Sequence, residues 1–157
     1  MKYIILFSLV MSFGTGFCQT ASELKQVRGK YRDSLVKVIE IINKEKEPRV
    51  NLIEFSIPEN EEESILFYSL DQQKESSSAF HILGRKIREL ISGGNHTILR
   101  KYLILSQYVD GYFAEAYFDH IESIIEVQRE LFCKTVKTIP QEKTKRLSEY
   151  KSRAHCP

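Results

Sequence analysis

The stretch FAEAYFDHIESIIEVQRE, residues 113–130, decides the fold class because its large apolar side chains recur at helical spacing. One face of such a helix would carry Phe113, Tyr117, Ile121 and Ile125. Apolar residues at every third or fourth position are typical of an amphipathic α-helix that packs against a core. We therefore expect a helix here, with its polar face toward solvent.

The same apolar pattern extends beyond this stretch, from His96 to about Lys137. An unbroken helix of that length would measure about 63 Å at 1.5 Å per residue, which is longer than a domain of this size can cover. Asp110 and Gly111 supply a natural break, because glycine is a poor helix former and an Asp-Gly pair favours a turn. The pattern predicts two helices or one kinked helix.

Two more helices are predicted on the N-terminal side. The first covers residues 20–46 and ends before Pro48. Its apolar seam consists of Leu24, Val27, Tyr31, Leu35, Val38 and Ile42. The second is capped by the serine run at residues 76–78 and ends at Gly93 or Gly94, either of which can adopt the left-handed conformation of a C-cap.

Residues 50–57 are predicted to form a short strand, and the residues that follow, up to position 70, admit two interpretations. Ile53, Phe55 and Ile57 alternate with polar residues, which is typical of a short strand, and the strand would form a β-hairpin with the apolar residues that follow. Alternatively, Asn60 caps a helix with Glu63 three residues further on. Acidic residues in a first turn suit the positive end of the helix dipole, so the helix is the favoured interpretation.

These patterns predict an all-α domain, an antiparallel bundle of four or five helices, with a short β-hairpin at residues 50–70 as the alternative. The predicted helices begin near residues 62, 79, 96 and 113, so two of them make the roughly 34-residue period of tetratricopeptide repeats. One unit resembles that repeat through Leu103, Gly111, Phe113 and Ala116. His120 and Ser123 depart from the motif and no second unit matches it, so the resemblance implies no function.

Residues 1–18 are predicted to be a secretory signal peptide. A positive charge precedes the apolar stretch YIILFSLVMSF, residues 3–13, and small residues follow it. The stretch is too short to act as a transmembrane anchor, which takes about 20 helical residues. Cleavage after Cys18 would leave residues 19–157 as a single helical domain, periplasmic or secreted. Retention of Cys18 as a lipid anchor is the alternative, but the large side chain of Phe17 argues against it.

Removal of Cys18 would leave Cys133 and Cys156, an even pair in a chain sent to an oxidising compartment. A bridge between them would close a loop of about 24 residues and stabilise the fold by roughly 3 kcal/mol. We therefore predict a disulfide between these two cysteines. Neither has neighbours that would lower the pKa of its thiol, so catalysis by a reactive cysteine is not expected.

The formal net charge of +2 gives no electrostatic case for binding nucleic acid. The C-terminal segment is nevertheless locally basic. Between residues 134 and 157 it contains Lys134, Lys137, Lys143, Lys145, Arg146, Lys151 and Arg153, against only Glu142 and Glu149. Such a segment is either a solvated last helix held to the bundle by the disulfide or a surface for an acidic partner.

An acidic stripe is the main candidate site. Its members are Glu115, Asp119, Glu122, Glu126 and Glu130, spaced so that their carboxylates share one helix face. Such a face could bind a metal or do hydrolytic acid–base chemistry together with His120, but the Glu-x-x-His motif of helical di-metal sites occurs nowhere in the chain. We expect no metal and no cofactor, and interpret the stripe as a solvated face, an interface, or a surface that docks a basic stripe on the first helix. That basic stripe consists of Lys25, Arg28 and Arg32.

Asn95-His96-Thr97 fits the N-glycosylation pattern, which makes Asn95 a candidate acceptor in an exported eukaryotic protein. No catalytic motif is recognisable in the sequence. We therefore expect an exported, non-catalytic helical protein that binds a protein or cell-envelope partner, in the manner of an immunity or inhibitor protein or of a secreted signalling protein. A metal-binding or hydrolytic protein that uses the acidic stripe is the alternative.

Overall fold

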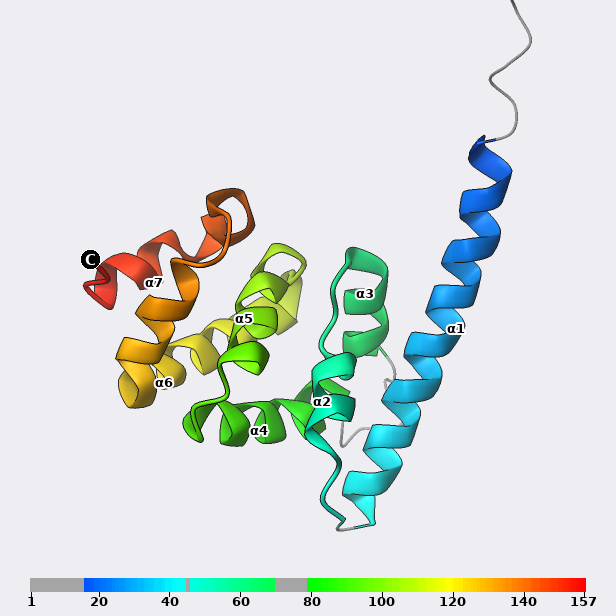
Figure 1. Ribbon diagram of the computed structural model, residues 1–157, viewed down its shortest axis with the longest axis horizontal. Coiled ribbons are helices and arrows are strands. Elements are labelled where there is room, and N and C mark those ends of the chain that lie inside the picture. Colours follow the sequence, from blue (N-terminus) through cyan, green and yellow to red (C-terminus); the bar gives the residue numbers. More distant parts are fainter. Residues whose placement is uncertain (1–15, 45, 70–78) are drawn as a thin grey trace, which may run out of the picture.

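The computed structural model describes residues 16–44, 46–69 and 79–157, with side chains from residue 29 onward except at positions 69, 79 and 112 (Figure 1). Within these ranges every regular element is helical and there is no strand, so the predicted all-α class is confirmed. The α-helices are α1 (Gly16–Asn43), α2 (Val50–Ser56), α3 (Glu61–Ser69), α4 (Ala79–Ser92), α5 (His96–Ile104), α6 (Gly111–Val136) and α7 (Ser148–Arg153). Two 3-10 helices complete the set, η1 (Leu105–Gln107) and η2 (Gln141–Leu147).

The helices follow one another across the molecule from α1 to α7. Figure 1 shows α1 along one side, with α2 and α3 next to it, and α6 and α7 at the opposite end beside the C-terminus. The α4 helix lies alongside the first part of α6, and the two run in the same direction, because Phe80 contacts Phe113 near their starts and Gln128 bonds to Ser92 at the end of α4. The antiparallel bundle is therefore not confirmed, and the described ranges contain seven α-helices where the sequence predicts four or five.

The predicted β-hairpin at residues 50–70 is wrong, because this segment forms α2 and α3. The Ile53 and Ile57 side chains are buried one helical turn apart, whereas Phe55 is 51% exposed instead of lying with them as it would on a strand. The start of α3 follows the favoured interpretation. The side chain of Asn60 accepts a hydrogen bond from the Glu63 amide at 2.9 Å, and the Glu63 carboxylate accepts one from the Glu59 amide at 2.8 Å.

The helix boundaries that depend on glycine were predicted correctly. Gly94 follows α4 with a positive φ of 87°, the left-handed conformation expected there. Gly111, with a φ of 55°, begins α6, and the Asp110 side chain accepts a hydrogen bond from its amide at 2.7 Å. The apolar pattern from His96 onward is therefore divided between α5 and α6. The starts of α3 to α6 also lie within two residues of the predicted positions.

One core contains buried side chains from α1 to α6, and Leu147 and Ala154 of the C-terminal segment also belong to it. Its largest fully buried side chains are aromatic: Tyr31, Phe67, Phe80, Tyr102, Tyr117 and Phe132. Two of the tyrosines also connect elements, because their hydroxyls donate to backbone carbonyls at 2.8 Å, Tyr31 to Ser56 and Tyr117 to Tyr102. Satisfying these hydroxyls internally lets large aromatic rings be buried without leaving polar atoms unpaired.

Two sequence predictions fall wholly or partly outside the described residues. Of the predicted signal peptide, residues 1–15 are not described, and α1 begins at Gly16 and passes through Cys18, the predicted cleavage point. The serine run at residues 76–78, predicted to cap α4, is not described either. Among the helices that are described, none combines the length and the apolar character needed to cross a membrane.

Candidate functional site

The acidic stripe lies on α6, and its members differ in their surroundings. Glu115, Asp119, Glu126 and Glu130 are exposed. Glu122 is half-buried and forms an ion pair with Arg153 of α7, which also lies 3.7 Å from Glu149. Part of the acidic face is therefore covered by the C-terminal segment of the same chain.

His120 does not join the acidic stripe, because its ring points into the α4–α6 interface. The ring is stacked on Phe80 with 5.2 Å between centroids, and its Nδ1 lies 2.9 Å from the Tyr102 hydroxyl. Burial, and to a smaller extent the positive charges of Arg88 and His81, lower the pKa of His120 to about 4. The metal or hydrolytic hypothesis thus lacks the imidazole that it placed beside the carboxylates. In the described part of the chain no three His, Cys, Asp or Glu side chains lie where they could hold a metal ion together.

The basic stripe is separated from the acidic one. Arg32 is exposed on α1, and the side chains of Lys25 and Arg28 lie outside the described residues. Arg32 borders a small pocket of about 260 Å³ between α1 and α3, together with Glu62 and Ile65. Among the described residues no ion pair joins Arg32 to the acidic stripe, so the expected docking of the two stripes is not observed. The acidic face contacts Arg153 instead.

A stack of aromatic rings and guanidinium groups holds the C-terminal segment on α6. The rings of Phe118 and Tyr150 are parallel, with 5.1 Å between centroids and 2° between planes. Arg146 lies over Phe118 at 5.5 Å, and Arg153 lies over Tyr150 at 5.0 Å. Arg146 also donates to the carbonyl of Val109. Two of the cations that make this segment basic are thus already engaged within the chain, since cation–π contacts and ion pairs hold them in place.

The disulfide predicted between Cys133 and Cys156 is present, with 5.1 Å between the two Cα atoms. It fastens the turn after α7 to the C-terminal half of α6. In that turn the amides of His155 and Cys156 donate to the carbonyls of Ser152 and Lys151, which is the hydrogen-bond pattern of a Schellman motif. The left-handed position of the motif is occupied by His155, with a φ of 49°, where glycine is the usual residue.

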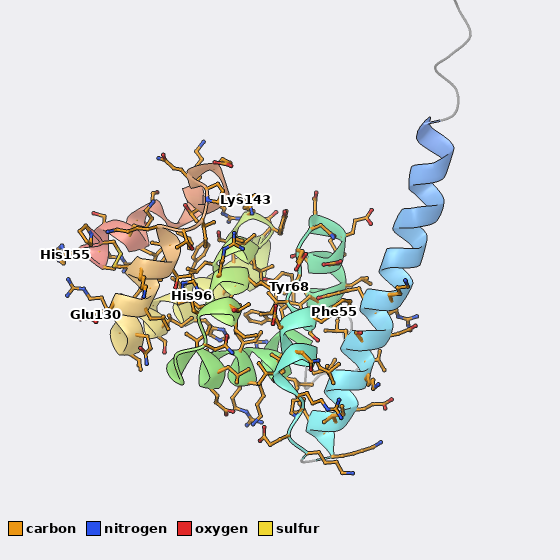
Figure 2. The ribbon with its side chains drawn as sticks, in the orientation of Figure 1. Phe55, Tyr68, His96, Glu130, Lys143 and His155 are labelled. Carbon is orange, nitrogen blue, oxygen red and sulfur yellow. A yellow bond between two sulfur atoms is a disulfide. The ribbon has the colours of Figure 1, made fainter. Side chains whose placement is uncertain are left out.

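A cleft of about 890 Å³ lies between the C-terminal half of α6 and this turn. Its α6 side is lined by Glu126, Val127, Gln128, Arg129, Glu130, Cys133, Lys134 and Lys137, and its other side by His155 and Pro157. Figure 2 shows Glu130 of α6 and His155 at the same end of the molecule. The cleft borders the predicted acidic stripe, because Glu126 and Glu130 belong to both.

The α6 side of the cleft contains a kink. Gln128 has φ −135° and ψ 45°, values outside the helical region, and its side-chain amide donates to the Ser92 carbonyl at the end of α4 at 2.7 Å. At the next residue, Arg129 uses its Nε to donate to the Ala154 carbonyl at 2.8 Å. These two hydrogen bonds connect α6 to α4 and to the C-terminal turn, which holds the cleft walls in place.

The charges in the cleft are separated along α6. Glu126 and Glu130 lie near the kink, together with Arg129, whose Nε is bonded to the Ala154 carbonyl, and Lys134 and Lys137 lie toward the end of the helix. The two glutamates and the two lysines are exposed, and among the described residues none of these four has an ion pair within 4.0 Å. Sequence reasoning noted the lysines only as part of a basic tail and missed the cleft. The spacing of three residues between the two lysines can be read from the sequence. The kink at Gln128 cannot, because no Pro or Gly marks it.

Asn95, the predicted glycosylation acceptor, is the N-cap of α5. Its side-chain oxygen accepts a hydrogen bond from the Ile98 amide at 3.0 Å. This role accounts for an asparagine at the position, because Asn is among the best N-cap residues. Glycosylation at Asn95 stays a prediction.

Comparison with known proteins gives no relative for this chain. No family model, no curated protein and no solved structure matches it.

Proposed function

We propose that this chain is an exported protein that binds a protein or cell-envelope partner without catalysis. The observation that carries the proposal is the cleft on α6, in which four exposed charged side chains have no ion-pair partner among the described residues. Charges left free on a concave surface favour recognition of a partner with complementary charges. Val127, which is 63% exposed in the same cleft, adds an apolar contact.

Export is supported by the sequence of residues 1–18 and by the disulfide, because structural disulfides persist in oxidising compartments. The mass of the protein purified from its native host tests this part. We expect a chain that begins at Gln19 and has two fewer hydrogens than the reduced form. A chain that begins at a lipid-modified Cys18 would contradict the predicted cleavage after Cys18 and show a lipid-anchored protein. A full-length reduced chain in the cytosol would overturn export.

The acidic stripe is the weaker of the two candidate surfaces, because Glu122 is engaged by Arg153. Its other members remain open to a partner. Metal analysis of the purified protein separates binding from the alternative function. Stoichiometric zinc or iron that is lost on Asp119→Ala would replace the binding proposal by a metal-dependent one.

Co-purification from the native host tests partner binding. The protein with Lys134→Glu and Lys137→Glu in the cleft should retain less of a specific partner than the unmodified protein. The matched control carries Lys143→Glu and Lys145→Glu, which make the same change in net charge on exposed residues of η2. Equal recovery of the partner with both variants would show that the cleft is not its binding site.

A further inference from the structure

The order of charges along the cleft limits what it can bind. The acidic pair Glu126 and Glu130 is centred near residue 128, and the basic pair Lys134 and Lys137 is centred between residues 135 and 136. At 1.5 Å per residue the two centres are about 11 Å apart along the helix. A ligand that satisfies both pairs must carry a positive and a negative group at a similar separation.

A uniformly charged ligand does not fit this arrangement. A polyanion such as nucleic acid would be attracted by Lys134, Lys137 and Arg129 but repelled by the carboxylates of Glu126 and Glu130. A polycation would be attracted by the two carboxylates and repelled by the three cations. Free amino acids are also unsuitable, because their two charges are too close together to reach both pairs. An extended polypeptide advances about 3.3 Å per residue, so side chains three positions apart lie about 10 Å from one another.

The cleft also offers groups that suit a peptide between these charged ends. The exposed Val127 provides an apolar contact near the kink. Arg129 has its Nε bonded to the Ala154 carbonyl, and no bond of its two terminal nitrogens occurs among the described residues. Those nitrogens can donate to peptide carbonyls or to a carboxylate.

Resting on the proposed binding function, we propose that the α6 cleft binds an extended polypeptide segment that carries basic and acidic side chains about three positions apart. The basic side chains contact Glu126 and Glu130, and the acidic ones contact Lys134 and Lys137. The disulfide and the hydrogen bond from Arg129 to the Ala154 carbonyl fix the two walls relative to each other, so the site exists before the partner arrives. The partner is therefore recognised by its pattern of charges.

Three blocked pentapeptides test the proposal with the intact, oxidised protein. The mixed probe is Arg-Arg-Leu-Glu-Glu, and the uniform probes are Arg-Arg-Leu-Arg-Arg and Glu-Glu-Leu-Glu-Glu. Titration followed by NMR at low ionic strength should show the mixed probe binding about tenfold more tightly than either uniform probe, since two ion pairs are gained instead of one gained and one opposed. The shifted resonances should be those of residues 126–137 and of His155.

Charge exchange in the protein should change the preference in a defined direction. With Lys134→Glu and Lys137→Glu the α6 side of the cleft keeps Arg129 as its one cation against four carboxylates and should prefer the all-Arg probe, whereas Glu126→Lys with Glu130→Lys should prefer the all-Glu probe. The control, Lys143→Glu with Lys145→Glu, should retain the preference for the mixed probe. Every one of these substitutions is at an exposed position, and circular dichroism verifies the fold.

The outcome for the unmodified protein decides the proposal even if a variant does not fold. Equal binding of the three probes, or shifts outside the cleft, would overturn it. Loss of a host partner in the Lys134→Glu, Lys137→Glu variant without any probe preference would leave the proposed function standing and overturn only the peptide assignment. A protein that is never exported but prefers the mixed probe would support the peptide assignment and overturn the proposed function.

Discussion

Gly84 of α4 and His120 of α6 face each other so closely that a Cβ atom at position 84 would lie 2.9 Å from Cε1 of the imidazole. The ring lies against this glycine and is stacked on Phe80, one helical turn before it. The absence of a side chain at Gly84 therefore sets how closely α4 approaches α6. It also explains why His120 is in the interior rather than beside the carboxylates of its own helix.

Gly84→Ala should destabilise the fold by about 1 to 3 kcal/mol, because an added methyl group in a filled interface forces its neighbours to shift. This loss should occur although alanine is the better helix former by about 1 kcal/mol. The matched control is Gly29→Ala in α1, where a Cβ meets no atom within 4 Å and should instead stabilise the protein. Urea denaturation measures both. Similar responses of the two variants would contradict the close contact.

The same contact predicts non-additivity. In a His120→Ala background the imidazole is absent, so Gly84→Ala should lose its penalty and behave like Gly29→Ala. A double-mutant cycle from the four free energies of unfolding gives the coupling between positions 84 and 120. A coupling energy near zero would show that the penalty at Gly84 comes from another neighbour.

His120 should make stability depend on pH. Burial lowers its pKa from 6.5 to about 4, so the unfolded chain takes up a proton more readily than the folded protein does. The stabilisation is therefore complete above about pH 6.5 and is lost as the pH falls toward 4. We expect a loss of about 2 kcal/mol over this range once the partial exposure of the ring is allowed for.

The comparison with His120→Gln isolates this contribution, because other groups titrate over the same range. Glutamine cannot take up the proton, so the difference in unfolding free energy between the two proteins should shrink as the pH is lowered from 7 to 4. Parallel pH profiles would show that His120 titrates normally. NMR titration of the imidazole measures the pKa directly.

The sequence predicts the helical class and several boundaries because these depend on local chemistry. Gly94 and Gly111 were placed correctly since a left-handed backbone is a property of the residue itself. The strand predicted at residues 50–57 was wrong, because alternation of apolar residues over so short a stretch is also compatible with a helix. The burial of Ile53 and Ile57 against α1 and the rest of the core, with Phe55 exposed, decides for the helix.

The candidate site was predicted only in part, because it depends on tertiary contacts. The spacing of Glu122 and Glu126 on one helix face follows from periodicity, but their different roles follow from where α7 lies. Gln128 is an ordinary helix residue in sequence, and its non-helical backbone accompanies a hydrogen bond to Ser92, a residue far away in the chain. His120 could not be assigned to the interior without knowing that Gly84 faces it.

Loss of the disulfide should destabilise the protein by roughly 3 kcal/mol, the chain-entropy value for the loop between Cys133 and Cys156. Cys133→Ser with Cys156→Ser, compared with the oxidised protein in urea, measures this loss. The stack of Phe118 and Tyr150 should keep α7 in place at neutral pH. Unchanged stability of the double variant would show that this stack suffices without the covalent link.

His155→Gly should stabilise the protein by about 1 kcal/mol, because it removes a side chain from a left-handed backbone position that disfavours any residue with a Cβ. The reverse exchange, Gly94→Ala, should destabilise by a similar amount. Gly94 also has a positive φ, and a Cβ atom added there would meet no other atom within 4 Å, so only the backbone conformation is tested. Thermal and urea unfolding of the two variants should shift in opposite directions. A destabilising His155→Gly would show that the imidazole makes a stabilising contact in the cleft, and binding of the mixed pentapeptide to this variant would then reveal whether that contact also serves recognition.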